Sequence, residues 1–184
     1  MVVLRIISIC CFCLLCVGPV HVHAISMSDA QKVTENQLKV AFFYNFIRFA
    51  NWPDAAFPKD NVPFKICVAS SNDSIFQVLS ANDVHGRKIE VVKYKVLSDL
   101  IGCQAVFIGK EKDSNFIKQV MHRIKNKPIL VVGESEDFLD VGGMIRLKSI
   151  NGKLAFEINN ESAKESGLTL SSKMLALARN RQIR

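Results

Sequence analysis

The chain has 184 residues, of which 49% are hydrophobic and 22% charged, and its formal net charge is +7. This length suits one domain of ordinary size, and the composition excludes disordered, collagen-like and repeat-array proteins. A pI near 9.2 is compatible with an anionic partner. Since no block of five like charges occurs, we expect no nucleic-acid-binding arm and no nucleic acid among the partners.

The first 24 residues have the layout of a secretory signal. Arg5 precedes an apolar run from Ile6 to Val17, and the segment ends in Val22-His23-Ala24. That run is too short for the roughly 20 residues that span a bilayer. We therefore predict cleavage after Ala24 and export, which leaves one domain over 25–184 that does not itself span the membrane. Because Arg5 is the only one of the 24 Lys and Arg residues before the cut, that domain has 23 basic and 17 acidic residues, or +6.

Only two of the six cysteines, Cys67 and Cys103, lie after the predicted signal. In an oxidising compartment a lone pair of thiols is a candidate disulfide. Two buried free thiols, each acting as a small apolar side chain, are the alternative. The pair does not form a C-x-x-C motif, so the sequence gives little support to a thioredoxin-like redox role.

A long helix is predicted at the start of the exported domain. The chain from Asp29 to Asn51 contains no Gly or Pro, and Pro53 ends it. Its apolar residues cover an arc of roughly 200°, about twice the usual stripe. Such a helix must be buried on more than one side. Core packing explains this face, and a dimer or partner interface is the alternative.

Alternating strands and helices follow. Short β-branched and apolar runs occur at 64–69, 88–94, 104–108 and 128–132. Three of them are almost continuously apolar, which is typical of strands buried on both faces of a parallel sheet. A short helix is predicted over 74–80, and a longer one is predicted around 116–124 with Asp113 or Ser114 as its N-cap.

The last third of the chain predicts a different arrangement. Two strand-like runs, 144–150 and 153–159, flank Asn151-Gly152, a strong signal for a tight antiparallel hairpin. Asn160 is predicted to cap a short helix that Gly167 ends, and Ser171 or Ser172 to cap a final helix. The fold class is therefore α/β: a single domain with a mixed sheet of about six strands, four parallel plus a C-terminal hairpin, flanked by helices.

Catalytic chemistry has little support in this sequence. His85 and His122 lie far apart and near no cysteine, and no serine has the G-x-S-x-G setting of a nucleophile. We expect no enzyme activity, no metal and no cofactor. A small-molecule pocket, if one exists, is predicted outside the carboxyl ends of the parallel strands. Four residues are placed there: Ser70, Ser71, Lys110 and Glu134.

Three motifs carry a family resemblance. They are KVAFFYNFIRFANWP at 39–53, GGMI at 142–145, and FEIN at 156–159, the last followed by Ala163, Gly167-Leu168 and Ser171-Ser172. Their order and spacing resemble those of the YfiR-like periplasmic family from about residue 32 to residue 179. One such motif would be weak evidence, whereas three in series after an export signal are fairly specific.

The resemblance implies a function. Members similar to YfiR are non-enzymatic regulators that bind the periplasmic sensor domain of a membrane-bound diguanylate cyclase, hold it inactive, and so lower cyclic-di-GMP signalling and biofilm formation. It also implies a homodimer and a redox-sensitive disulfide at Cys67 and Cys103. Some members have a second cysteine pair near GGMI, and 137–152 has none here.

The expected partner contacts lie on two segments. One is the solvent-exposed face of the first helix, and the other is the C-terminal segment. For each residue, burial in the core is the alternative to a partner contact. The predicted contact residues are Arg48, Leu168, Leu170, Lys173 and Met174. The alternative function is a periplasmic small-molecule-binding sensor protein.

Overall fold

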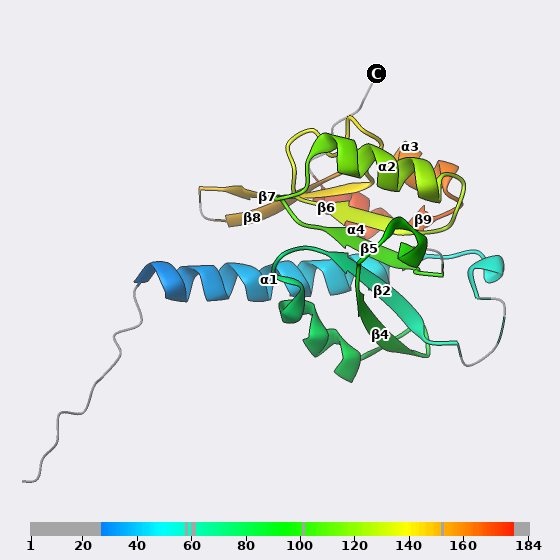
Figure 1. The fold of residues 1–184 in the computed structure, drawn as a ribbon, viewed down its shortest axis with the longest axis horizontal. Helices are drawn as coiled ribbons and strands as arrows, with labels where there is room; N and C mark the ends of the chain where they lie inside the picture. The colour runs from blue at the N-terminus through cyan, green and yellow to red at the C-terminus, as the bar shows by residue number, and fades with distance from the viewer. Residues whose placement is uncertain (1–26, 58, 60–61, 101, 152, 179–184) are drawn as a thin grey trace, which may run out of the picture. The chain divides into compact units, whose positions relative to one another are not determined.

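A computed structural model describes residues 27–57, 59, 62–100, 102–151 and 153–178. The described residues from Val33 onward form one compact unit, and every contact discussed below lies within it. The unit contains a seven-stranded mixed sheet flanked by helices (Figure 1), so the predicted α/β class is confirmed.

Five neighbouring strands of the sheet are parallel. Its full order is β3-β4-β2-β5-β6-β7-β8, and the two outermost strands, β3 and β8, run antiparallel to their neighbours. The buried runs 64–69, 105–108 and 130–133 form the centre, as their continuous apolar character predicted. The strands are β2 (Phe64–Ala69), β3 (Asp83–Val84), β4 (Arg87–Lys93), β5 (Ala105–Ile108), β6 (Leu130–Gly133), β7 (Ile145–Ile150) and β8 (Lys153–Ile158).

Helix α1 (Met27–Phe49) is buried on two sides, as its wide apolar face predicted. On one side Phe43 packs edge-on against Phe76 and Phe107. On the other, Phe42 and Phe46 pack against Phe156 of β8. The helix therefore links the middle of the sheet to the C-terminal hairpin through aromatic contacts, which favour such tilted and edge-to-face geometries.

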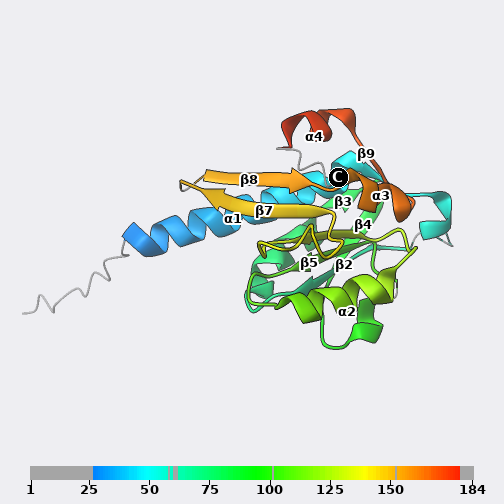
Figure 2. The same ribbon diagram turned by 90° about the horizontal axis from the view of Figure 1, so that it is seen from above.

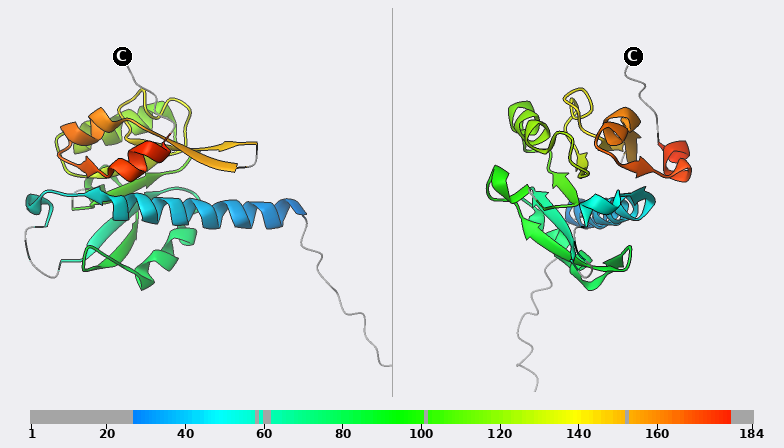
Figure 3. Two further views of the ribbon diagram at one scale, coloured as in Figure 1. Left: turned by 180° about the vertical axis from the view of Figure 1, so that it is seen from behind. Right: turned by 90° about the vertical axis from the view of Figure 1, so that its right-hand side faces the viewer.

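Helices cover both faces of the sheet. The right-hand view of Figure 3 shows α1 on one side and α2 (Ser114–Ile124) on the other. The 3-10 helix η2 (Asp73–Ala81), predicted as a short helix, packs against α1, where Phe76 contacts Phe43. The 3-10 helix η3 (Leu97–Leu100) packs against α2. A further 3-10 turn, η1 (Asp54–Ala56), follows the end of α1.

The helix caps largely match the predicted ones. The Asp113 side chain accepts a hydrogen bond from the backbone N–H of Phe116 and caps α2, and Ser171 caps α4 (Ser172–Leu177). In helix α3 (Asn160–Glu165) the cap is Asn159 rather than Asn160, because Asn159 accepts from the N–H of Ser162. The sequence offered two adjacent asparagines, and only the backbone at Asn159 is extended.

The C-terminal hairpin and one short strand pairing complete the fold. Strands β7 and β8 pair with the register expected for a two-residue turn, and Asn151 has a φ of 51°. Gly152 lies outside the described residues. Strand β1 (Ala50–Asn51) pairs with β9 (Thr169–Leu170) in a separate two-stranded sheet, which the sequence analysis did not predict.

Candidate functional site

The three sequence motifs meet in space. Ile145 of GGMI pairs with Ile158 of FEIN in the hairpin, and the Asn159 N–H donates to the Met144 carbonyl. The FEIN phenylalanine, Phe156, packs against α1, as described above. Motifs more than 100 positions apart in sequence thus form one structural unit at the β6–β8 side of the sheet.

An ion pair joins the first motif to the end of β6. Lys39 of α1 lies 2.6 Å from Glu134, measured between Nζ and Oε1, and the two side chains are only 11% and 13% exposed. Glu134 is one of the predicted pocket residues, and it does follow the carboxyl end of a parallel strand. Its partner Lys39 was not anticipated.

A second charged cluster lies on the hairpin. Glu157 contacts both Arg146, with an Nη2–Oε2 distance of 3.0 Å, and Lys148. Arg146 also donates to the backbone carbonyl of Glu136. The register pairs Arg146 directly with Glu157. Counting outward from the Asn151-Gly152 turn would have found this pair, since opposite charges at facing positions stabilise a hairpin.

These two clusters border a cleft of about 310 Å³. Two of the predicted pocket residues, Lys110 and Glu134, line it. The sequence analysis missed the other polar residues of its wall, which come from α1, the loop after β6, and β7. The lining is formed by Glu35, Lys110, Glu134, Glu136, Arg146, Leu147, Lys148, Ser149 and Leu154.

Ser70 and Ser71 do not line this cleft. They follow β2 at the point between β2 and β5 where the strand order reverses, which is where open α/β sheets usually bind ligands. Here the Glu111 carboxylate fills that position. Its Oε1 accepts a hydrogen bond from the Ser71 N–H at 2.6 Å, and it lies close against Gly109. The four side chains predicted to form one crevice are therefore divided between two places. Ser70 and Ser71 lie at the position that Glu111 occupies, and Lys110 and Glu134 line the cleft.

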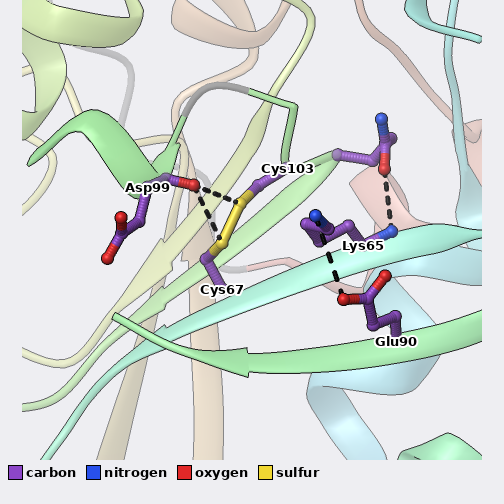
Figure 4. A network of polar contacts seen from close by, with 6 residues as sticks. Lys65, Cys67, Glu90, Asp99 and Cys103 are labelled. Carbon is purple, nitrogen blue, oxygen red and sulfur yellow. Dashed lines mark hydrogen bonds and ion pairs between the residues drawn. A yellow bond between two sulfur atoms is a disulfide. The ribbon is translucent and has the colours of Figure 1, made fainter. Parts of the chain in front are cut away.

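A disulfide joins Cys67 to Cys103, whose Cα atoms are 6.0 Å apart (Figure 4). Cys67 lies within β2, and Cys103 lies just before β5, the neighbouring parallel strand. The two residues are 0% and 2% exposed. The carbonyl oxygen of Asp99 in η3 lies 3.2 Å from the Cys103 Sγ. The bond therefore sits in the core and ties the η3–β5 connection to the centre of the sheet.

The predicted partner-contact residues fall into two groups. Leu168, Leu170 and Met174 are 2%, 5% and 2% exposed, so these three side chains serve core packing, the alternative that the sequence left open. Arg48 and Lys173 are exposed. The structure brings their elements together, because β1 follows α1 directly and pairs with β9 just before α4.

Two apolar side chains accompany these cations. Phe49, 41% exposed, is next to Arg48, and its carbonyl accepts from the Ser171 N–H; Leu177 of α4 is 75% exposed. We call Arg48, Phe49, Lys173 and Leu177 the α1–α4 surface. Aromatic side chains and Arg are enriched at protein-binding surfaces, which favours Phe49 and Arg48 as contact residues over Lys173.

Other expectations concern export, membranes and metals. The predicted signal and its cleavage after Ala24 lie outside the described residues. Across the described ranges, no helix combines the length and apolar character that crossing a membrane demands. Within those same ranges, no three His, Cys, Asp or Glu side chains are grouped as a metal site requires.

Comparison with known proteins identifies a family. No curated protein matches the chain. A family model described as YfiR/HmsC-like matches residues 36–179, a span that includes all three motifs, the disulfide, the whole α1–α4 surface and the lining of the cleft except Glu35. The chain belongs to the YfiR/HmsC-like family.

Proposed function

We propose that this protein is a periplasmic regulator that binds the periplasmic sensor domain of a membrane-bound diguanylate cyclase and represses it, which lowers cyclic-di-GMP signalling. The observation that carries the proposal is the family match over 36–179, which implies a YfiR-like regulatory role. Regulators of this family are generally not enzymes. The buried Cys67–Cys103 disulfide supports an oxidising location such as the periplasm.

Repression by contact needs only a difference in affinity. A regulator that binds the inactive state of the cyclase more tightly than the active state shifts the population toward the inactive one. The α1–α4 surface has the features such contact requires, since it combines two exposed cations with two exposed apolar side chains. We assign the partner contact to this surface, through Arg48 and Lys173.

The test is capture of the partner. The exported protein, carrying an affinity tag, is incubated with detergent-solubilised inner membranes of its own organism, and bound proteins are identified by mass spectrometry. Recovery of a diguanylate cyclase with a periplasmic sensor domain is the expected result. Its absence from the bound fraction, while the tagged protein remains folded, would contradict the proposal.

A second function, small-molecule sensing, is favoured by the cleft alone. Its volume of about 310 Å³ is at the lower end of ligand pockets, and charged side chains of both signs line it. A ligand there would contact both α1 and the hairpin. A thermal-shift screen with nucleotides, amino acids and indoles tests this, because specific binding raises the melting temperature. A shift that persists after Lys110→Ala and Arg146→Ala would place the ligand elsewhere.

A further inference from the structure

Helix α2 and the loop after it have an unusual charge distribution. From Ser114 to Gly133 the chain contains four Lys or Arg residues and no Asp or Glu. Since the whole chain has 24 basic and 17 acidic residues, this segment of 20 residues contributes +4 and the other 164 contribute +3. More than half of the net charge is therefore concentrated on one helix and its C-terminal loop. We call Lys118, Arg123, Lys125 and Lys127 the basic face of α2.

Three of these four cations are exposed, and Lys127 is half-buried. The apolar residues Ile117, Val120 and Ile124 hold α2 on the sheet, and Lys118, Arg123 and Lys125 are exposed. Within the described part of the chain, none of the four cations forms an ion pair. Most other basic side chains of the sheet and of the hairpin do have carboxylate partners, for example Lys88 with Asp83 and Lys93 with Asp73.

Two carboxylates lie at the other end of α2. Asp113 caps its first turn, and Asp137 accepts a hydrogen bond from Ser114. Asp99 of η3 accepts from two backbone N–H groups. One further carboxylate, Asp140, is exposed in the loop after β6. An 11-residue helix is about 16 Å long, so the two carboxylates at its first turn, Asp113 and Asp137, are remote from the cations at its C-terminal end.

Favourable interaction with the helix dipole explains only part of this pattern. The dipole favours cations in the last turn, and Arg123 is there. Lys118 lies in the middle of the helix, and Lys125 and Lys127 lie at and beyond its end. A dipole effect does not account for the absence of acids across the whole segment, either. The exposed positions of α2 and of its C-terminal loop thus present a surface that is complementary to negative charge.

We propose that the basic face of α2 holds this protein against an anionic phospholipid bilayer. Long, flexible cationic side chains spread over a convex helix suit a plane of mobile headgroups better than a partner with fixed acidic positions. Each Lys or Arg near an anionic surface strengthens binding about five-fold. This proposal does not depend on the identity of the partner protein.

Binding to lipid through α2 would leave the side of the protein that carries α4 accessible to a partner. Figure 2 shows α2 on one side of the molecule and α4 on the other, and the right-hand view of Figure 3 agrees. A protein resting on lipid through α2 would therefore turn the α1–α4 surface away from the bilayer. A membrane-anchored domain that rises from the same bilayer could then reach that surface while the regulator remains attached.

The test is vesicle flotation of the exported protein. Vesicles of phosphatidylcholine with 30% phosphatidylglycerol are compared with pure phosphatidylcholine at low salt. We expect flotation only with the anionic vesicles. We also expect 0.5 M salt to abolish it, because the Debye length at that ionic strength is only about 4 Å and the attraction between the cations and the lipid headgroups is screened. Flotation that is equal on neutral vesicles, or absent on anionic ones, would overturn the proposal.

A triple variant locates the contact. Lys118→Gln/Arg123→Gln/Lys125→Gln changes only exposed side chains and is expected to weaken binding on the order of a hundred-fold. The control Lys88→Gln/Lys153→Gln/Lys164→Gln removes the same net charge from other exposed positions and is expected to bind nearly as well as wild type. Equal loss in both variants would show an effect of net charge alone and would refute a specific face. If the first variant still floats but no longer binds the cyclase sensor domain, the face meets an acidic protein and the lipid proposal is wrong.

Discussion

The ring of Phe138 lies against the Cα of Gly143, so closely that a methyl group at Gly143 would overlap the ring. Gly133, at the end of β6, faces the same ring in the same way. The preceding glycine, Gly142, has a φ of +97°, a conformation that side chains rarely adopt. The two glycines of the GGMI motif are therefore required for different reasons, one for backbone conformation and one for space.

We predict that Gly143→Ala lowers the free energy of unfolding by about 1–3 kcal/mol, because overpacking forces the Phe138 ring or the backbone to move. Urea unfolding measures this. The matched variant is Phe138→Leu/Gly143→Ala, in which the smaller side chain relieves the overlap with the ring, while the Phe138 carbonyl remains close to the methyl group. The double variant should be more stable than the sum of the two single effects predicts. Strict additivity would show that the two residues do not compete for space.

The Lys39–Glu134 pair should matter more than an exposed pair. Its side chains are 11% and 13% exposed, so removing one partner leaves a nearly buried charge unpaired. We predict that Lys39→Met or Glu134→Leu alone lowers the free energy of unfolding by about 3–5 kcal/mol, and that the double variant recovers most of the loss. The measurement is chemical denaturation of all three variants.

An exposed pair on the sheet edge provides the control. Lys88 and Asp83 are 77% and 53% exposed at 3.0 Å, and Lys88→Met should cost at most about 1 kcal/mol. A Lys39→Met effect no larger than this control would contradict the role assigned to the buried pair.

The disulfide is predicted to stabilise the domain. It closes a loop with a sequence separation of 36 residues, for which chain entropy alone gives about 4 kcal/mol at most, before any strain. We expect Cys67→Ala/Cys103→Ala to lower the free energy of unfolding by about 2–4 kcal/mol. Reductant should destabilise the wild-type protein and leave this variant unchanged. A wild type that does not respond to reductant, even when unfolded, would show that the two cysteines are not joined.

Elements with local sequence signals were predicted well. The buried strands, α2 with its Asp113 cap, and the Asn151-Gly152 hairpin all have residues that specify them within a few positions. The two-residue strands β1 and β9 have no such pattern, because each exists only through its pairing with a distant segment. Hydrophobic periodicity describes one segment at a time, so it cannot reveal a pairing between two segments that are distant in sequence. Strand β3 was also not predicted, although it pairs locally with β4 across the turn His85-Gly86, whose two residues have positive φ.

The candidate site was predicted only in part, for a related reason. The strand-end rule placed Lys110 and Glu134 at one edge of the sheet, and both line the cleft. It also placed Ser70 and Ser71 there, but it could not foresee that the Glu111 carboxylate fills their position. Nor could the sequence tell that α4 turns Met174 inward and Lys173 outward, since a helix of six residues is too short for a clear stripe.

The α1–α4 surface leads to the last prediction. Arg48→Glu and Lys173→Glu each reverse an exposed charge on elements that the β1–β9 pairing holds together, so neither should disturb folding. We expect each variant to bind the cyclase sensor domain at least ten-fold more weakly and to raise cellular cyclic-di-GMP, because like charges across an interface are strongly unfavourable. Binding is measured with the isolated partner domain at two salt concentrations.

The control is Lys88→Glu, which makes the same charge change at an exposed position on β4. Its binding should stay within a factor of two or three of wild type. A double variant, Arg48→Glu/Lys173→Glu, distinguishes one contact from two, since residues that meet the same patch of the partner give non-additive losses. If both single variants repress the cyclase as well as wild type while their melting temperatures are unchanged, the partner binds elsewhere. The surface then serves only to join the end of α1 to the start of α4.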